Sequence, residues 1–362
     1  MQLTVLLLFL MGPCCVITSQ LYEYHYINES QNWTEAQNYC RKKHTDLATV
    51  TNMTDVKRLP TVQNNTQAWI GLYSSTGINR TWHWSLPGVE FNESQITWSY
   101  KEPNDVGGPE NCGFIRENRT LGDVSCEDNL GLFLCYNETN QNEPFYLIKE
   151  RKKWLEALKY CRDHHADLVS GPKQLNDPKL NTDSTEFMLV GLFRDTWLWS
   201  DGSSFSFRNW EVGFTDWQER NKCAVVCKNS TWNSTECDEK KPFICYEDKV
   251  ILVKQNKTWE EALEHCRQYH YELASITDLN QQRWIQDRAK QADTEHVWMG
   301  LRYTCTLGFW FWITDEVVSY KNWAPNGQRD ECDMSGAMET KGQHKWISKP
   351  DGEMFNFICF KK

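Results

Sequence analysis

Apolar and polar residues follow each other along this chain in a pattern that occurs three times. In the first copy Trp33, Ala36 and Cys40 occupy positions i, i+3 and i+7, with polar residues between them. That spacing puts the three side chains on one face of a helix. The same spacing recurs over residues 154–161 and 259–266. We therefore expect each of three successive units to begin with a helix that packs through its Trp, Ala and Cys side chains.

Strand patterns follow each predicted helix. Every unit has an apolar run ending in Gly-Leu, at residues 71–72, 191–192 and 300–301, and closes with a short apolar segment that contains a cysteine. A second helix is expected at residues 277–291 of the third unit. The matching helix pattern is weaker in the first unit, before Pro60, and is interrupted by prolines in the middle unit. Thr258 and Glu261 form a capping-box pattern at the start of the third unit's first helix.

The first nineteen residues are predicted to be a secretory signal peptide. They are apolar through Leu3–Leu10 and turn polar at Thr18, although no Lys or Arg marks a charged start. An uncleaved membrane anchor is the alternative, but the apolar run is shorter than the roughly 18–20 residues that a spanning helix needs. No later stretch predicts membrane insertion. The expected localisation is secreted and extracellular.

The patterns of cysteines and glycosylation sites agree with secretion. Beyond the signal there are thirteen cysteines and eleven Asn-X-Ser/Thr sites, at Asn28, Asn32, Asn52, Asn64, Asn79, Asn92, Asn118, Asn137, Asn229, Asn233 and Asn256. Both features indicate an oxidising, glycosylating compartment. A net charge of −10 and a pI near 5.5 argue against nucleic acid or an anionic membrane as a partner.

The helix spacing, the Gly-Leu strands and the recurring cysteines together resemble the C-type lectin-like domain family, from about Leu21 to Phe360. The resemblance implies an α+β fold for each unit, with two helices, two small antiparallel sheets, disulfide bonds and a long loop that carries the binding site. Beyond the predicted signal peptide at 1–19, it implies domains at 21–136, 144–246 and 249–360. The nearest picture is a secreted, mannose-receptor-like lectin with several domains.

The repeat and the resemblance imply the disulfide pairs. In each unit an outer bond is expected to tie the first helix to the last strand. In the first two units an inner bond is expected within the long loop. A further bond is predicted between Cys305 and Cys332, which leaves Cys227 free or linked to another chain as an odd cysteine. The expected outer pairs are Cys40–Cys135, Cys161–Cys245 and Cys266–Cys359, and the inner pairs are Cys112–Cys126 and Cys223–Cys237.

The chemistry of the first unit centres on Glu102-Pro103-Asn104, which precedes Glu110 and Asp123. In Ca²⁺-dependent members of the family this tripeptide has a cis proline bond and points its two flanking side chains at the metal. The resemblance makes Glu102, Asn104, Glu110 and Asp123 the predicted Ca²⁺ and carbohydrate ligands. Ca²⁺ takes six to eight oxygens, so two sugar hydroxyls could complete the set. The Glu-Pro-Asn order implies mannose-type glycans, including fucose and N-acetylglucosamine.

The sequence departs from a complete site at Leu121-Gly122-Asp123, where the family has Trp-Asn-Asp. Since ligand number tunes Ca²⁺ affinity, weaker binding is expected. A solvated acidic loop without metal is the alternative interpretation. Asp105 is not expected to form a second Ca²⁺ site, because Asn111 replaces a useful carboxylate. The second and third units have lost the tripeptide, reading Phe214-Thr215-Asp216 and Ala324-Pro325-Asn326.

No common catalytic motif is present, so an enzyme is not expected. The repeated histidines at 44, 165 and 270 are interpreted as structural. The sequence thus predicts a secreted Ca²⁺-dependent lectin whose first domain binds mannose-type glycans. Its other domains are free to contact proteins, and oligomers could form through Cys227. The alternative is a Ca²⁺-independent protein-binding module, such as an adhesion or receptor-decoy protein.

Overall fold

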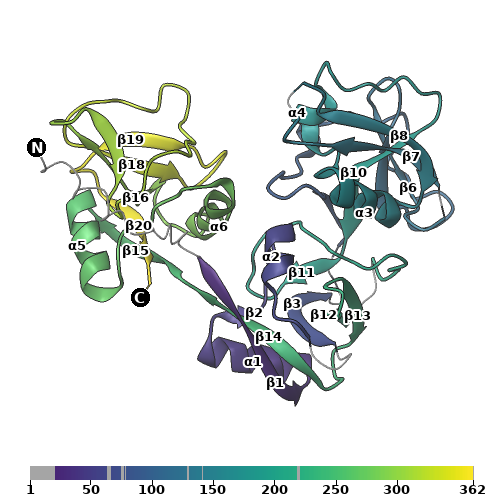
Figure 1. The fold of residues 1–362 in the computed structure, drawn as a ribbon, viewed down its shortest axis with the longest axis horizontal. Coiled ribbons are helices and arrows are strands. Elements are labelled where there is room, and N and C mark those ends of the chain that lie inside the picture. The colour runs from purple at the N-terminus through teal and green to yellow at the C-terminus, as the bar shows by residue number, and fades with distance from the viewer. Residues whose placement is uncertain are drawn as a thin grey trace, which may run out of the picture. The chain divides into compact units, whose positions relative to one another are not determined.

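The computed structural model describes residues 21–62, 67–74, 77, 79–128, 130–140, 142–217 and 221–361 (Figure 1). The predicted signal peptide and the glycosylation site at Asn64 lie outside these residues. The described residues divide into two compact units, residues 24–247 and residues 248–361 with 21–23, which we call the N-terminal and C-terminal units. No helix among the described residues is long and apolar enough to cross a bilayer.

The C-terminal unit has the two predicted helices and a single six-stranded sheet, where the resemblance implied two small antiparallel sheets. Cys266 on its first helix is bonded to Cys359 on its last strand, and the capping box of Thr258 and Glu261 is confirmed. The helices are α5 (Trp259–Tyr269) and α6 (Leu279–Ala289). The sheet order is β15 (Val250–Lys257), β20 (Phe355–Phe360), β16 (His296–Thr304), β18 (Met334–Glu339) and β19 (Trp346–Pro350), with β17 (Phe309–Trp312) paired to β16.

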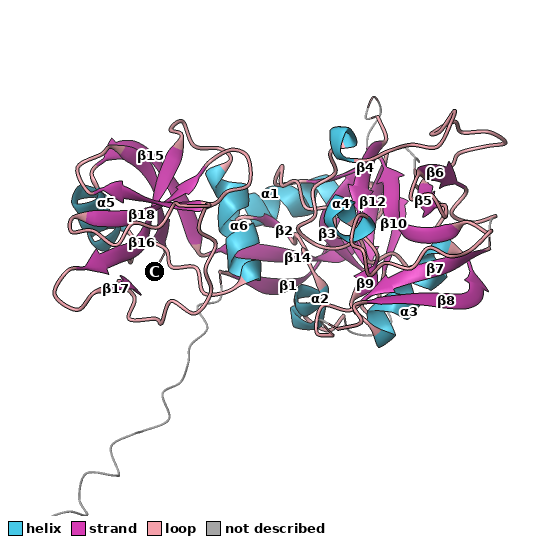
Figure 2. Ribbon diagram, turned by 90° about the horizontal axis from the view of Figure 1, so that it is seen from above, coloured by secondary structure: helices cyan, strands magenta, loops and turns pink. Residues whose placement is uncertain are grey.

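The N-terminal unit contains two seven-stranded sheets, and each defines a lobe (Figure 2). The first lobe has strands β1 (Tyr22–Gln31), β2 (Asp46–Leu47), β3 (Ala68–Ser74), β11 (Trp197–Trp199), β12 (Lys222–Val226), β13 (Trp232–Glu236) and β14 (Lys241–Asp248), with helices α1 (Trp33–Lys43) and α2 (Met53–Arg58). The second has β4 (Thr81–Trp84), β5 (Cys112–Ile115), β6 (Leu121–Val124), β7 (Gly131–Tyr136), β8 (Phe145–Lys152), β9 (Asp167–Leu168) and β10 (Met188–Asp195), with η1 (Glu93–Gln95), α3 (Trp154–His164) and α4 (Gly171–Leu175).

The first two sequence repeats exchange their halves. The first lobe joins β1–β3 of the first repeat to β11–β14 of the second, and the second lobe joins β4–β7 to β8–β10. In Figure 1 the purple helix α1 therefore lies beside the green strand β14. Each lobe still has the helix and sheet of a single unit, so the α+β architecture is confirmed while its connectivity differs from the expected one.

The exchange overturns two predicted disulfides. The expected bonds Cys40–Cys135 and Cys161–Cys245 are wrong, because Cys40 bonds to Cys245 and Cys135 bonds to Cys161. Each bond still ties the first helix of a lobe to its closing strand. The remaining predicted pairs form, namely Cys112–Cys126, Cys223–Cys237, Cys266–Cys359 and Cys305–Cys332, and Cys227 is free.

The physical reason lies in the short connection from β10 to β11. In each lobe and in the C-terminal unit, a tryptophan on the strand beside the Gly-Leu strand faces the leucine: Trp199 faces Leu72, Trp84 faces Leu192 and Trp312 faces Leu301. If the second repeat closed on itself in this register, only Asp195 and Thr196 would form the turn. Two-residue hairpin turns need positive φ angles, which suit Asn or Gly and disfavour a β-branched threonine. The chain instead continues through Thr196 into the other lobe.

The predicted helix face is buried in every copy. Trp33, Trp154 and Trp259 donate their indole N–H to a strand carbonyl beside the Gly-Leu pair, at 2.9, 2.7 and 2.9 Å. Each helix ends at one of the repeated histidines, whose backbone N–H donates to the carbonyl of the disulfide cysteine four residues earlier. The histidine main chain thus has the structural role that the pattern predicted.

Candidate functional site

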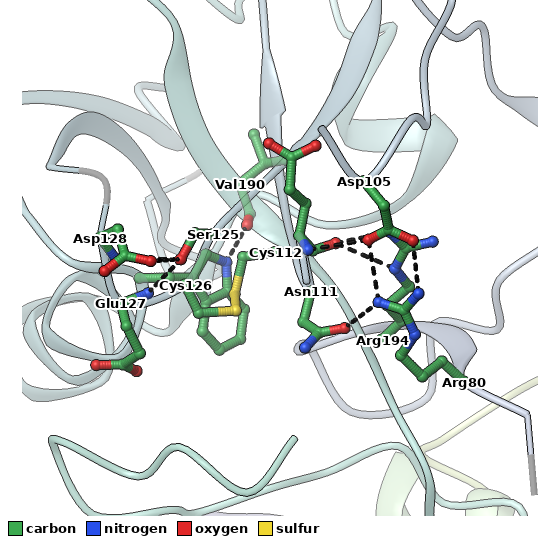
Figure 3. The surroundings of a disulfide bond; sticks show 12 residues. Arg80, Asp105, Asn111, Cys112, Ser125, Cys126, Glu127, Asp128, Val190 and Arg194 are labelled. Atoms are coloured by element: carbon green, nitrogen blue, oxygen red, sulfur yellow. Dashed lines mark hydrogen bonds and ion pairs between the residues drawn. A yellow bond between two sulfur atoms is a disulfide. The ribbon is translucent and has the colours of Figure 1, made fainter. Parts of the chain in front are cut away.

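The candidate site lies in the second lobe, in the loop that precedes the β5–β6 hairpin. The Glu102–Pro103 bond is cis. Gly113 of β5 faces Asp123 of β6, and the Cys112–Cys126 bond closes the hairpin (Figure 3). This hairpin holds Asp123 beneath the loop, where the residue as a whole is 3% exposed.

The four predicted ligand residues lie together. Glu102, Glu110 and Asp123 each offer a carboxylate oxygen, and the three oxygens are all within 4.8 Å of one another. Asn104 joins them, since its Nδ2 donates to Glu102 at 2.8 Å and its backbone N–H donates to Asp123 at 2.8 Å. Its Oδ1 accepts from the Val106 amide at 2.7 Å. The residues fit a hard cation such as Ca²⁺, which prefers oxygen ligands.

The carboxylates perturb one another. Burial, followed by the neighbouring Asp123 and then Glu110, raises the pKa of Glu102 from 4.5 to about 7. Burial and the charge of Asp123 also raise the pKa of Glu110. Like charges this close disfavour ionisation unless a proton or cation compensates them. The acidic cluster therefore has the electrostatic character expected of a cation site.

Sequence reasoning missed two arginines beside this cluster. Arg194 of β10 donates through Nη2 to Asp123 at 2.6 Å and to Asp105 at 2.7 Å. Its guanidinium lies 4.5 Å from the centre of the Trp82 ring. Arg194 belongs to the second repeat, and in the first repeat the matching position after Gly71-Leu72 is Ser74. Only the exchange of halves brings this cation to the site, so no local signal could have revealed it.

Asp105 lies between the two guanidinium groups in Figure 3. Arg80 donates to its Oδ2 at 2.6 Å and to Asn111 Oδ1 at 2.8 Å. Burial alone would raise the pKa of Asp105, but the bond from Arg80, the amide of Glu110 and the charge of Arg194 bring it below the usual range. Asp105 is thus compensated by protein cations.

Gly122, the departure from the family pattern, faces Phe114 across the β5–β6 pair. A Cβ atom at this position would collide with the Phe114 ring, including a contact of 2.8 Å to Cε1. The ring is 5% exposed and also contacts Phe187 at a centroid distance of 5.3 Å. The aromatic ring therefore occupies the space that a side chain at position 122 would need.

The other repeats replace the ligands with packing. Phe214, at the position of the tripeptide in the second repeat, stacks on Trp210 with ring centroids 3.9 Å apart. Asp216 accepts a hydrogen bond from Ser234. Within the described ranges, Glu102–Pro103 is the only cis peptide bond, so Ala324–Pro325 of the third repeat lacks that geometry. Neither repeat presents a matching carboxylate cluster among the residues described.

Comparison with known proteins places these observations in a family. The Lectin C-type domain model matches residues 29–137, 150–247 and 255–361. C-type mannose receptor 2 from Rattus norvegicus is 22% identical over 404 residues, which cover 88% of this chain and 26% of the receptor. The secretory phospholipase A2 receptor from Homo sapiens is 23% identical over 354 residues, which cover 84% of this chain and 23% of that receptor.

The chain spans about a quarter of the length of these relatives. Among solved structures, human lithostathine at 1.3 Å resolution is 24% identical, with a TM-score of 0.29 over 31% of this chain and 83% of that one.

Proposed function

Because this chain belongs to the C-type lectin domain family, whose members are generally binding modules and not enzymes, we propose that it is a secreted, glycosylated lectin that binds mannose-type glycans through Ca²⁺. The sugar site is the cluster of Glu102, Asn104, Glu110 and Asp123. The observation that carries this proposal is the convergence of three carboxylate oxygens within 4.8 Å, with Asn104 bonded to two of those residues.

The charge balance supports a divalent cation. Glu102, Asp105, Glu110 and Asp123 contribute four negative charges when ionised, and Arg80 and Arg194 contribute two positive charges. The formal excess of two negative charges equals the charge of one Ca²⁺ ion. A bound ion would supply the positive charge that attracts two neighbouring sugar hydroxyls.

The chain's own groups would set the sugar orientation. A carboxylate can only accept a hydrogen bond, whereas an Asn amide N–H can donate one. Glu102 therefore accepts from one hydroxyl and Asn104 donates to its neighbour. Asn104 is exposed and Glu102 is half-buried, so both side chains are accessible from solvent.

Affinity for the ion should be lower than in a complete family site. Gly122 contributes no side-chain oxygen, and Asp123 Oδ2 is already engaged by Arg194. One weak sugar site per chain would need several chains on one surface for useful avidity. Cys227, which is half-buried and forms no disulfide, provides one route to such assembly.

The test is retention of the full chain on mannose-agarose in Ca²⁺ and its elution by EDTA. The doubly substituted Glu102→Gln, Asn104→Asp variant should pass through the column. The matched control is Asn326→Asp in the third repeat, which should be retained like the wild type. If the wild type passes through in the presence of Ca²⁺, the lectin proposal is wrong.

A Ca²⁺-independent protein-binding module is the second candidate, and the arginines favour it. Arg194 and Arg80 already compensate Asp105 and Asp123, so the loop can be held without a metal. In that case partner binding would persist in EDTA and would be insensitive to Glu102→Gln.

A further inference from the structure

A second cluster of metal-ligating side chains lies in the first lobe, away from the candidate sugar site. It consists of His25 on β1, His44 at the C-terminus of α1, and Glu247 on β14. Their ligand atoms all lie within 4.8 Å of one another. His25 Nε2 is 3.5 Å and His44 Nδ1 is 4.0 Å from the same Glu247 oxygen, Oε2.

Both ring nitrogens are buried without a hydrogen-bond partner. The two imidazoles stack with centroids 4.5 Å apart and planes 22° from parallel. A buried polar atom normally has a hydrogen-bond partner, so two orphaned nitrogens that face one carboxylate need an explanation.

The other repeats provide an internal comparison, because each has residues at the three positions that match His25, His44 and Glu247. They are the residue eight before the helix tryptophan, the histidine that ends the helix, and the residue two after the closing cysteine. In the second lobe these positions hold Tyr146, His165 and Asn137, and in the C-terminal unit they hold Ile251, His270 and Lys361.

Neither of the other sets suits a cation. His165 stacks on Tyr146 with centroids 4.4 Å apart. After burial, the charge of Lys361 lowers the pKa of His270. In the first lobe all three positions thus hold metal-ligating residues, whereas the other two copies share only the histidine, whose main chain caps the helix. The shared fold explains the presence of His44, because every copy has a histidine there, but it does not explain His25 and Glu247.

We propose that His25, His44 and Glu247 form a binding site for a divalent transition-metal ion of the Zn²⁺ class. Imidazole and carboxylate ligands suit Zn²⁺, and three protein ligands leave a fourth position for water or another group. Zn–N bonds of about 2.0–2.1 Å bring tetrahedral ligand atoms to about 3.3 Å apart. The observed separations therefore contract on binding, through small rotations of the three side chains.

The site exists only because the halves are exchanged. His25 and His44 come from the first repeat and Glu247 comes from the second. If the first repeat closed on its own final strand, Asn137 would take the place of Glu247. The metal would join the same elements as the Cys40–Cys245 bond, since these cysteines lie four residues before His44 and two before Glu247. Zn²⁺ would accordingly stabilise the exchanged arrangement.

The test measures Zn²⁺ binding to the full disulfide-bonded chain by isothermal titration calorimetry, in a buffer that contains saturating Ca²⁺ and no EDTA. Co²⁺ is used as a second probe, because its visible absorption reports tetrahedral coordination. One equivalent should bind, and Zn²⁺ should raise the unfolding temperature as a ligand of the native state does. The variants His25→Tyr and Glu247→Asn, which copy the second lobe, should each weaken binding by more than about tenfold.

His270→Asn in the C-terminal unit is the matched control and should bind Zn²⁺ as the wild type does. Far-ultraviolet circular dichroism and the disulfide map verify that each variant folds. If Glu247→Asn does not fold, His25→Tyr supplies the test. Equal Zn²⁺ affinity in the wild type, His25→Tyr and His270→Asn would mean nonspecific surface binding and would overturn the proposal. Absence of binding to the wild type would overturn it as well. Neither result bears on retention by mannose-agarose, which depends on the other lobe.

Discussion

Arg194 and Asp123, which are 71 residues apart in the sequence, form a close ion pair with an Nη2–Oδ2 distance of 2.6 Å. The Asp123 side chain is wholly buried and that of Arg194 is 11% exposed. The pair joins Asp123, a proposed ligand of the candidate site, to a strand contributed by the next repeat. Ca²⁺ binding is therefore expected to be linked to the exchange of halves.

Replacing Arg194 with serine, the residue at the matching position in the first repeat, should make stability depend on Ca²⁺. Removing one partner of a buried pair costs about 3–5 kcal/mol because the other charge is left uncompensated. Ca²⁺ can compensate Asp123, so the rise in unfolding temperature between EDTA and Ca²⁺ should be larger than in the wild type.

The control for Arg194→Ser is Arg208→Gln, which breaks the buried pair between Arg208 and Asp195 at 2.9 Å. It should destabilise the chain to a similar extent without rescue by Ca²⁺. An Arg194→Ser protein whose Ca²⁺-dependent shift equals that of the wild type would show that Asp123 is not a ligand.

Ca²⁺ binding should weaken as the pH falls through about 7. The pKa of Glu102 is raised to about 7, so its carboxyl takes up a proton below this value and competes with the metal. Calcium titrations from about pH 8 to about pH 6 check this. A binding constant that does not change over this range would contradict the assignment of Glu102 as a ligand.

The same raised pKa gives the opposite trend for stability without Ca²⁺. The folded state holds a proton on Glu102 more tightly than the unfolded chain, whose ordinary value is 4.5. Stability in EDTA should therefore fall as the pH rises from about 4.5 to about 7. Urea unfolding of the wild type and of Glu102→Gln measures this contribution, which the glutamine variant should lack.

Restoring the missing asparagine at position 122 should not restore the site by itself. Gly122→Asn forces the new side chain against Phe114 and should cost about 1–3 kcal/mol by overpacking. Combining it with Phe114→Ala should cost less than the sum of the two single changes, with a coupling of about 0.5–3 kcal/mol. Chemical denaturation of the four proteins in this cycle measures the coupling, and strict additivity would show that the ring is not the obstacle.

Lengthening the connection between β10 and β11 should undo the exchange. Insertion of Gly-Ser-Asn-Gly between Asp195 and Thr196 supplies a turn that the second repeat lacks, so β10 and β11 can pair with each other. Non-reducing peptide mapping should then find Cys40–Cys135 and Cys161–Cys245 in place of the wild-type pairs. The same insertion after Thr306 in the C-terminal unit should leave Cys266–Cys359 unchanged.

The patterns that depend on residues close in sequence were sufficient to predict the local structure. The spacing of Trp33, Ala36 and Cys40 predicted a helix whose buried face the structure confirms. The repeat and the family resemblance predicted the short-range bond Cys112–Cys126, which the structure confirms, and the tripeptide at residues 102–104 directed attention to the proposed sugar site. These features are determined locally because a helix face, a hairpin and a tight loop involve neighbours along the chain.

The tertiary structure alone decided which half packs on which. The first two repeats have the same helix, cysteine and strand pattern, so the closing strand of either repeat can complete either lobe, and the local pattern cannot choose between them. We expect the choice to depend on whether the two residues Asp195 and Thr196 can turn the chain back. The exchange of halves sets the partners of Cys40 and Cys161, brings Arg194 to Asp123, and places Glu247 beside His25 and His44.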